Sequence, residues 1–221
     1  MKQILRYGLI LLCFSGLAGV SLHGVNVLTR ERIAAAQQRA LTEGQRQIFP
    51  AAARFGEQKT FPVGNKTAQY FEAFDTNGVC IGYELLHTVQ GYQSPITVLT
   101  AIDRRGIIAG IKILSQAETP GLGAEVEAVP ASRTLWQALA GLVRRVPAQV
   151  RPAAPPLPPF QAQFAGKSLT QLRVVKQPTR DAIEAIAGAT ITSEAVTKAV
   201  RDAISNFFLH VAHPPTSEQS P

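Results

Sequence analysis

A long apolar run near the N-terminus is the first pattern in the chain. Residues 7–28 carry no Asp, Glu, Lys or Arg, and their length approaches the roughly 20 residues that cross a bilayer as a helix. Lys2 and Arg6 precede the run, so a cleaved signal peptide is the alternative, but residues 18–20 make a poor small-residue cleavage site. Because the run is long for a signal peptide, we expect an uncleaved single-pass anchor over residues 1–28.

A mostly polar segment follows the apolar run. Between residues 29 and 48 only Ile33, Ala36, Ala40 and Leu41 form a weak apolar stripe, and most of the other side chains are Arg, Gln and Glu. This pattern is typical of a solvated helix, and Pro50 ends it. We therefore expect a helical stalk and linker over residues 29–60.

Residues 61–116 have the composition and turn signals of β-strands. Asn77-Gly78 is a strong hairpin signal, and the segment 103–106 forms a second turn. The sequence therefore predicts antiparallel strands that could bury one face of a sheet. His87 lies on one of them, and we interpret it as a packing or surface residue because no second histidine is placed to join it as a ligand. The predicted strands span residues 70–74, 79–89, 96–102 and 107–114.

The C-terminal part predicts an amphipathic helix that ends before His213-Pro214-Pro215. Its apolar residues recur at three- and four-residue steps, which marks one buried face: Val196, Val200, Ala203, Ile204, Phe207 and Phe208.

The fold class that follows is α+β: an N-terminal transmembrane helix, then one domain over residues 61–212 with an antiparallel sheet and packed helices. Between the sheet and the last helix we expect three further elements, and after the helix a polar tail. They are a short helix at 132–143, an exposed proline-rich insertion at 144–159, a strand at 172–176 that returns to the sheet, and a disordered tail at 213–221.

Charge and cysteine content exclude several classes of function. The net charge is +7, but the basic residues are scattered and no nucleic-acid module appears, so we expect no nucleic-acid binding. Cys13 and Cys80 are the two cysteines, they lie in different segments, and neither is part of a Cys-x-x-Cys pair. We therefore expect no internal disulfide and no zinc or iron–sulfur site.

Three hydroxyl residues, Thr190, Thr192 and Ser193, stand at the start of the C-terminal helix, just after the small pair Gly188-Ala189. Such hydroxyls commonly cap the free N–H groups of a helix. A helix N-terminus also suits a phosphate, because its N–H groups and dipole attract negative charge. The residues alone leave both interpretations open and favour the cap.

Two motifs carry a resemblance to a known family. Residues 187–192, Ala-Gly-Ala-Thr-Ile-Thr, resemble the flavinylation motif of the FMN-binding domain family, usually Ser/Thr-Gly-Ala-Thr-x-Thr/Ser, with Ala187 as the departure. Residues 118–123, Glu-Thr-Pro-Gly-Leu-Gly, resemble the second hallmark of that family. With the apolar N-terminus, nearly the whole chain resembles the G subunit of the Rnf-type ion-translocating electron transport complex.

The resemblance implies a covalent FMN on Thr192, held through a phosphoester bond that a separate flavin transferase makes. Pro120 and Gly121, at the two central positions, predict a type II turn in the loop 118–123. We expect this loop to face residues 187–193 and to hold the isoalloxazine ring, while residues 187–193 hold the phosphate. Further cofactor-binding residues would be Glu118, Thr119, Gly121, Leu122, Gly123, Gly188, Ala189, Thr190 and Ser193.

The resemblance also implies a place and partners. The chain would be an electron-transfer subunit in the cell inner membrane, with its globular domain on the periplasmic side and the other subunits of the complex as partners. It would have no independent active site, since no general acid–base pair or nucleophilic triad is apparent. The alternatives are a component like the C subunit of the sodium-translocating NADH:quinone oxidoreductase, a stand-alone FMN protein, or a non-redox membrane scaffold.

Overall fold

The computed structural model describes residues 2–127, 157–177, 179 and 181–211. The chain divides into two compact units, Met1–Thr42 and Glu43–Pro221. The predicted helix at 132–143, nearly all of the proline-rich insertion and the polar tail lie outside the described residues.

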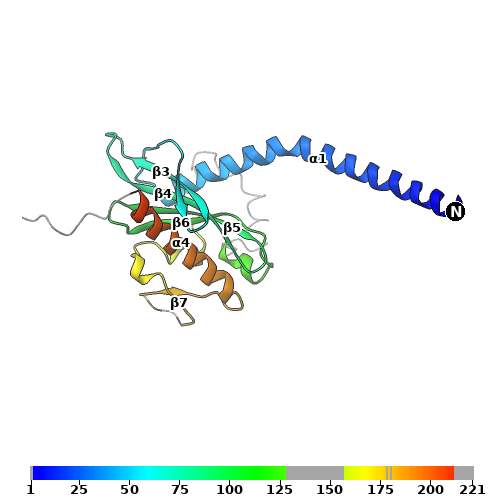
Figure 1. The fold of residues 1–221 in the computed structure, drawn as a ribbon. Helices are drawn as coiled ribbons and strands as arrows, with labels where there is room; N and C mark the ends of the chain where they lie inside the picture. The colour runs from blue at the N-terminus through cyan, green and yellow to red at the C-terminus, as the bar shows by residue number, and fades with distance from the viewer. Residues whose placement is uncertain (1, 128–156, 178, 180, 212–221) are drawn as a thin grey trace, which may run out of the picture. The chain divides into compact units, whose positions relative to one another are not determined.

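A single continuous helix, α1 (Lys2–Ile48), makes up the first unit and enters the second (Figure 1). Its apolar side chains, including Leu11, Leu22 and Leu28, are exposed. Among the described residues it is the one helix long and apolar enough to cross a membrane. A helix that leaves so much apolar surface uncovered suits lipid better than water.

The second unit is built on an antiparallel sheet with the order β1-β3-β4-β5-β6, and β2 also pairs with β3. The four predicted strands are confirmed. β1 and the first residues of β2 fall in the expected linker, because a two-residue strand and a strand containing Pro62 give a weak pattern. The strands are β1 (Arg54–Phe55), β2 (Lys59–Val63), β3 (Lys66–Phe74), β4 (Cys80–Gln90), β5 (Pro95–Asp103) and β6 (Ile108–Ser115).

Two hairpin turns share one construction. Asp75 and Asp103 each use Oδ1 to accept the N–H groups two and four residues further on, at 2.8–2.9 Å. Gly78 and Gly106 supply the positive φ, at 78° and 83°, that closes each turn. The register of β3 with β4 and that of β5 with β6 are thus set by local chemistry that the sequence displays.

The helix α4 (Thr190–His210) covers one face of the sheet. Its predicted apolar face is confirmed, since Val196, Val200 and Phe207 are buried in the core. The Phe207 ring lies 5.2 Å from that of Tyr70 and 4.8 Å from that of Tyr83, centroid to centroid. These aromatic contacts fix α4 on the strands and so fix the position of its N-terminus.

The opposite face of the sheet is also covered, which the expected single buried face did not anticipate. The last turn of α1 places Ile48 and Phe49 there, both buried. They fit because Gly82 and Gly110 carry no Cβ, which would contact Phe49 and Ile48 respectively. The end of the predicted solvated stalk and linker therefore belongs to the core of the second unit.

The chain between sheet and helix forms short elements: η1 (Gly123–Val126), α3 (Pro159–Ala162), η2 (Leu169–Gln171), β7 (Val174–Val175) and β8 (Ile183–Glu184). β7 pairs in parallel with β8 in a separate sheet, so the prediction that residues 172–176 return to the main sheet is wrong. The edge beside Ile108 is already occupied, because Ile108 exchanges backbone hydrogen bonds with Gly166 and Lys167 at 2.7 and 2.9 Å.

Candidate functional site

The two motif loops meet at the N-terminus of α4. The Thr192 hydroxyl donates a hydrogen bond to Oε2 of Glu118 at 2.9 Å, across 74 positions of sequence. Around this contact lies a pocket of about 400 Å³, within the size range of small-molecule sites. Its lining is formed by Tyr92, Glu118, Thr119, Leu122, Gly123, Gly188, Ala189, Thr190, Ile191 and Thr192.

The Glu118 carboxylate is held by the turn between β4 and β5. Its Oε1 accepts the N–H groups of Gln93 and Ser94 at 3.0 and 2.9 Å and the Ser94 hydroxyl at 3.3 Å. Burial by itself would raise the pKa of Glu118, which is 5% exposed, but the hydrogen bonds from Ser94, Gln93 and Thr192 outweigh it and hold that pKa below its usual value. The site therefore presents a fixed negative charge to the Thr192 hydroxyl.

The Thr192 side chain lies in the first turn of α4 and is 2% exposed. The helix begins after Ala189, which provides no side-chain cap, so the capping role considered for the hydroxyls is wrong. The Thr192 hydroxyl points to Glu118 rather than to a backbone N–H group. The N-terminal N–H groups of α4 consequently keep their capacity to bind a negative group.

Ser193 has a different task from Thr192. Its hydroxyl donates to the carbonyl of Ala189 at 2.9 Å and accepts the N–H of Ile186 at 3.1 Å. The side chain is fully buried and does not line the pocket. It fixes the backbone of the loop that precedes α4 and so supports the site from behind.

Two glycines allow the loops to approach. A Cβ on Gly123 would lie 2.7 Å from Oε2 of Glu118 and 2.9 Å from Oγ1 of Thr192. A Cβ on Gly188, whose φ is 78°, would lie 2.9 Å from Leu122. Side chains at either position would push the two motif loops apart.

The turn in the first motif has the predicted form. The Leu122 N–H donates to the carbonyl of Thr119 at 3.2 Å, and Gly121 has a φ of 75°, as a type II turn requires. Gly121 shapes the turn without lining the pocket. Of the predicted residues, the structure thus brings all but Gly121 and Ser193 to the pocket.

Sequence reasoning missed Tyr92 and Ile191, which also line the pocket and are exposed. The only signal was an aromatic residue between Gly91 and Gln93 in a turn, and an apolar residue inside the second motif. With Leu122 they place apolar surface around the polar Glu118–Thr192 contact. The pocket thus has the composition of a site for a ligand that is apolar in part and anionic in part.

Comparison with protein families gives two matches. Residues 91–205 match the model of the FMN-binding domain, and residues 1–48 match the model of the RnfG N-terminal region. The first match spans both motif loops, and the second spans α1.

Among curated proteins, the chain resembles the G subunit of the Na⁺-translocating ferredoxin:NAD⁺ oxidoreductase complex of Acetobacterium woodii. The two are 30% identical over 218 residues, which covers 92% of this chain and 91% of the relative. The G subunit of the ion-translocating oxidoreductase complex of Methanosarcina acetivorans is 25% identical over 207 residues, covering 92% and 94%.

Among solved structures, the fold resembles the C subunit of the Na⁺-translocating NADH-quinone reductase of Parabacteroides distasonis. The TM-score is 0.50 at 17% sequence identity, with 84% of this chain and 97% of that chain covered. At this identity the match speaks for the fold alone.

Proposed function

Since the chain belongs to the FMN-binding domain family, as a G subunit of the RnfG type, we propose that it carries FMN esterified to Thr192 and transfers electrons within an ion-translocating ferredoxin:NAD⁺ oxidoreductase complex. The observation that carries the proposal is the buried hydroxyl of Thr192, bonded to Glu118 where the two motif loops meet. The match to a G subunit over nearly its full length favours this complex over the quinone-reducing one.

The residues present fit the phosphate of FMN. Thr192 lies in the first turn of α4, where the N–H groups at a helix start stabilise negative charge by about 0.3–1 kcal/mol. Glycines at 123 and 188 bring the backbone close to this place. A phosphoester on Oγ1 of Thr192 would therefore lie at the positive end of a helix, beside the pocket that both loops line, and it would replace the hydrogen bond to Glu118.

The residues around Thr192 also fit the isoalloxazine ring. Leu122, Ile191 and Tyr92 are large and exposed, and they surround the pocket. Thr119 adds a hydroxyl, which donates to the Gln93 side chain at 2.8 Å. In this proposal the ring packs between these side chains, and its redox chemistry supplies the one- and two-electron steps that the protein itself lacks.

Glu118 is suited to the attachment reaction. The proton of the Thr192 hydroxyl already lies on a hydrogen bond to Glu118, whose pKa is lowered and which is therefore ionised at neutral pH. A carboxylate that accepts a hydroxyl proton makes the oxygen a better nucleophile. A flavin transferase would then bring the phosphoryl donor: Oγ1 of Thr192 bonds to the phosphorus of FMN, the bond from phosphorus to the donor's leaving group breaks, and the hydroxyl proton passes to Glu118.

The proposal places the chain at a membrane. Residues 1–28 would be a single-pass anchor in the inner membrane, followed by the linker to residue 60 and the FMN-binding domain at 61–212 on the periplasmic side. The apolar helix α1 and the membrane complexes of the relatives support anchoring. The partners would be the other subunits of the complex and a flavin transferase.

The test is flavin attachment in the full chain, expressed with a flavin transferase in a cell that exports the domain. We expect a fluorescent band on a denaturing gel and FMN phosphate on the peptide that contains Thr192. The Thr192→Val variant should be dark, and the matched Thr197→Val variant, which removes a buried hydroxyl of the same helix outside the pocket, should stay fluorescent.

Covalent flavin on Thr192→Val would refute the assignment of the attachment residue. If the wild-type band shows no flavin fluorescence while the transferase is active on another target, the interpretation as a non-redox membrane scaffold would be favoured. Co-purification with quinone-reducing rather than ferredoxin-oxidising subunits would favour the second complex, whose C subunit shares the fold.

A further inference from the structure

The two oxygens of the Glu118 carboxylate have different surroundings. Oε1 accepts the N–H groups of Gln93 and Ser94 at 3.0 and 2.9 Å and the Ser94 hydroxyl at 3.3 Å. Oε2 accepts the Thr192 hydroxyl at 2.9 Å. The carboxylate cannot turn away from Thr192 without giving up the three bonds to Oε1. Oε2 is therefore held beside Oγ1 of Thr192, whatever group that oxygen carries.

The backbone of Gly123 closes the other side of this contact. A Cβ at position 123 would lie 2.7 Å from Oε2 of Glu118 and 2.9 Å from Oγ1 of Thr192. Glu118, Thr192 and Gly123 are all buried. In such a place water screens charge poorly, so a second negative group beside Oε2 would act on the carboxylate strongly.

Esterification of Thr192 would reverse what Oε2 meets. In the flavin-free chain, burial raises the pKa of Glu118, but the hydrogen bonds from the turn and from Thr192 outweigh it and keep the carboxyl ionised at neutral pH. A phosphoester on Oγ1 removes the Thr192 proton from Oε2 and adds a negative charge next to it. A lost donor and a gained like charge both favour the protonated form of Glu118.

The pocket supplies no side-chain cation to offset that charge. Among the described residues that line it, the only titratable ones are Glu118 and Tyr92. The elements packed around it add Glu125 on η1 and Glu194 on α4, which are exposed and also negative. The N-terminus of α4 carries about half a positive unit, against two negative units if the phosphoester and the carboxylate were both charged.

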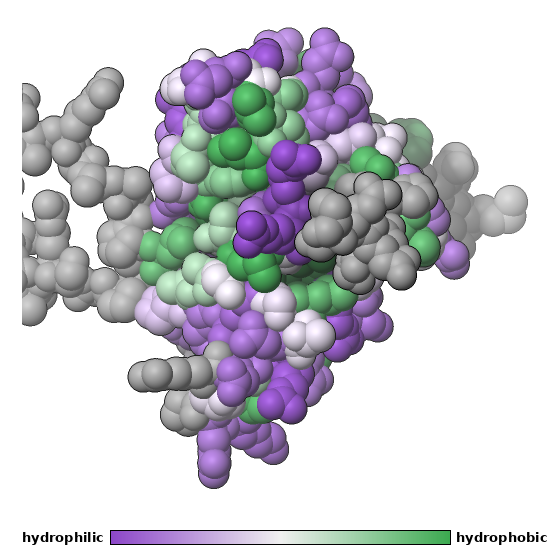
Figure 2. All heavy atoms as spheres, turned by 90° about the vertical axis from the view of Figure 1, so that its left-hand side faces the viewer, coloured by the Kyte–Doolittle hydropathy of each residue, from purple (hydrophilic) through white to green (hydrophobic). Residues whose placement is uncertain are grey.

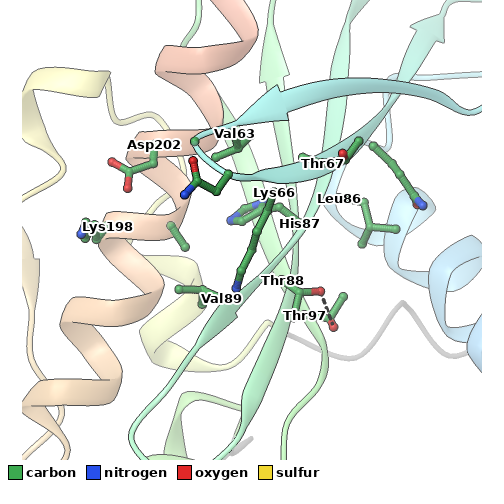
Figure 3. A pocket seen from close by; sticks show the side chains of 15 residues that line it. Val63, Lys66, Thr67, Leu86, His87, Thr88, Val89, Thr97, Lys198 and Asp202 are labelled. Carbon is green, nitrogen blue, oxygen red and sulfur yellow. Dashed lines mark hydrogen bonds between the residues drawn. The ribbon is translucent and has the colours of Figure 1, made fainter.

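The lysines Lys66 and Lys198 belong to a separate pocket. It has a volume of about 720 Å³, lies between the β2–β3 hairpin, β4 and α4, and shares no lining residue with the Thr192 site (Figure 3). On the face of the domain shown in Figure 2, hydrophilic side chains lie at the surface between hydrophobic patches. Water and salt screen charges in such positions, so they compensate a buried charge weakly.

We propose that Glu118 keeps the proton of the Thr192 hydroxyl after flavin attachment and changes from a hydrogen-bond acceptor into a neutral acid that donates to the phosphoester. The inference rests on the proposed function and concerns the same site. Glu118 takes the proton because a phosphodiester is a far stronger acid than a carboxylic acid. The site then has one negative charge before attachment, on the carboxylate, and one afterwards, on the phosphoester.

The attachment step balances with this proton in place. The donor is a diphosphate ester of the flavin, which the flavin transferase supplies. The O–H bond of Thr192 breaks, and Oγ1 forms a bond to the phosphorus of FMN. The bond from phosphorus to the second phosphate breaks, and that phosphate leaves with the electron pair. The proton ends on Oε2 of Glu118, the atom that already accepts it in a hydrogen bond.

Infrared absorption of the full chain in detergent tests the protonation directly. The chain carries carbon-13 in the side-chain carboxyl of glutamate, so that glutamate bands shift and those of the flavin do not. The flavin-free form comes from cells without the transferase, the flavinylated form from cells with it, and mass spectrometry establishes flavin on Thr192. At pH 7 we expect one additional label-sensitive band of a protonated carboxyl group in the flavinylated form.

Two variants assign the band. Burial raises the pKa of Glu84 to about 8, so this acid is mostly protonated in both forms, and the additional band should persist in Glu84→Gln. Thr192→Val removes the hydroxyl donor without adding a charge. It should show no additional band, because the three hydrogen bonds to Oε1 of Glu118 remain.

The pH dependence of unfolding is a second readout. In the flavin-free chain the pKa of Glu118 is lowered, so its contribution to stability is lost only as the pH falls into the acid range. In the flavinylated chain, folded Glu118 keeps a proton that the unfolded chain releases above about pH 4.3. Between about pH 5 and pH 7, the unfolding constant of the flavinylated form relative to the flavin-free form should therefore rise by up to about tenfold per pH unit. The contribution of Glu84 is common to both forms and cancels.

Three results would overturn the inference while the proposed function stands. They are flavin on Thr192 without the additional band, the same band in Thr192→Val, and parallel pH dependence of unfolding in the two forms. Absence of flavin from Thr192 is a different failure, since it would contradict the proposed function itself and this inference with it.

Discussion

Two buried glutamates of the same domain are in opposite electrostatic states. Glu118 accepts four hydrogen bonds and has a lowered pKa. Glu84 is fully buried in β4, and among the described residues neither of its oxygens has a hydrogen bond of good geometry. Burial raises the pKa of Glu84 to about 8, and the Gln45 side chain offsets only part of the rise.

The backbone explains the difference. In the middle of a sheet every N–H group is engaged with a neighbouring strand, so none is free to bond the Glu84 carboxylate. In the turn between β4 and β5 the N–H groups of Gln93 and Ser94 are free and converge on Glu118. Burial alone therefore does not determine whether a carboxyl group is ionised. The number of hydrogen-bond donors available to the carboxylate determines its pKa, and a turn has free backbone N–H groups that can act as donors.

The largest loss of unfolding free energy should come from removing the Glu118 carboxylate. Glu118→Ala leaves two backbone N–H groups and the Thr192 hydroxyl without their acceptor, which should cost about 3 kcal/mol or more of unfolding free energy. The urea midpoint of the full chain measures it, with the exposed Glu125→Ala as control. Equal midpoints for the two variants would mean that the carboxylate is not held as described.

A change in unfolding free energy that depends on pH, and is smaller per pH unit than the loss in Glu118→Ala, should come from Glu84. Its pKa is raised in the folded state, so the folded state keeps a proton that the unfolded state loses above about pH 4.3. Stability should therefore fall by about 1.4 kcal/mol per pH unit as the pH rises from there toward 8.

Glu84→Gln should remove this slope, since an amide does not titrate. Urea midpoints between about pH 5 and pH 8 test it. Glu57→Gln, at an exposed position, is the matched control and should keep the wild-type slope. An unchanged slope in Glu84→Gln would show that Glu84 is already ionised.

The smallest effect should come from an exposed pair. Lys59 and Glu72 form an ion pair at 2.8 Å with both side chains partly in solvent. Because water and salt screen such pairs, Lys59→Met should change the urea midpoint less than either variant above, and the change should shrink as salt is added. A shift as large as that of Glu118→Ala would contradict the ranking.

The sequence predicted what local pattern encodes. The apolar period of α4, the two turn motifs and the alternation of the strands gave the elements and their faces. The Glu118–Thr192 contact was expected only as two loops facing each other, because its partners are 74 positions apart. Three other features depend on tertiary contacts that no local sequence pattern predicts. They are the hydrogen bond of Ser193 to the loop before α4, the place of Tyr92 in the pocket lining and the pairing of β7 with β8.

The end of α1 determines where this domain can be cut. Ile48 and Phe49 fill the space above Gly82 and Gly110, and the compact unit that contains them begins at Glu43. A fragment that starts at the first strand would lack Ile48 and Phe49. The sheet face that they cover would then be exposed to solvent and prone to self-association. A fragment whose sheet is covered on both faces must start at or before Glu43, inside α1. The boundary of the domain therefore does not coincide with a boundary between secondary-structure elements.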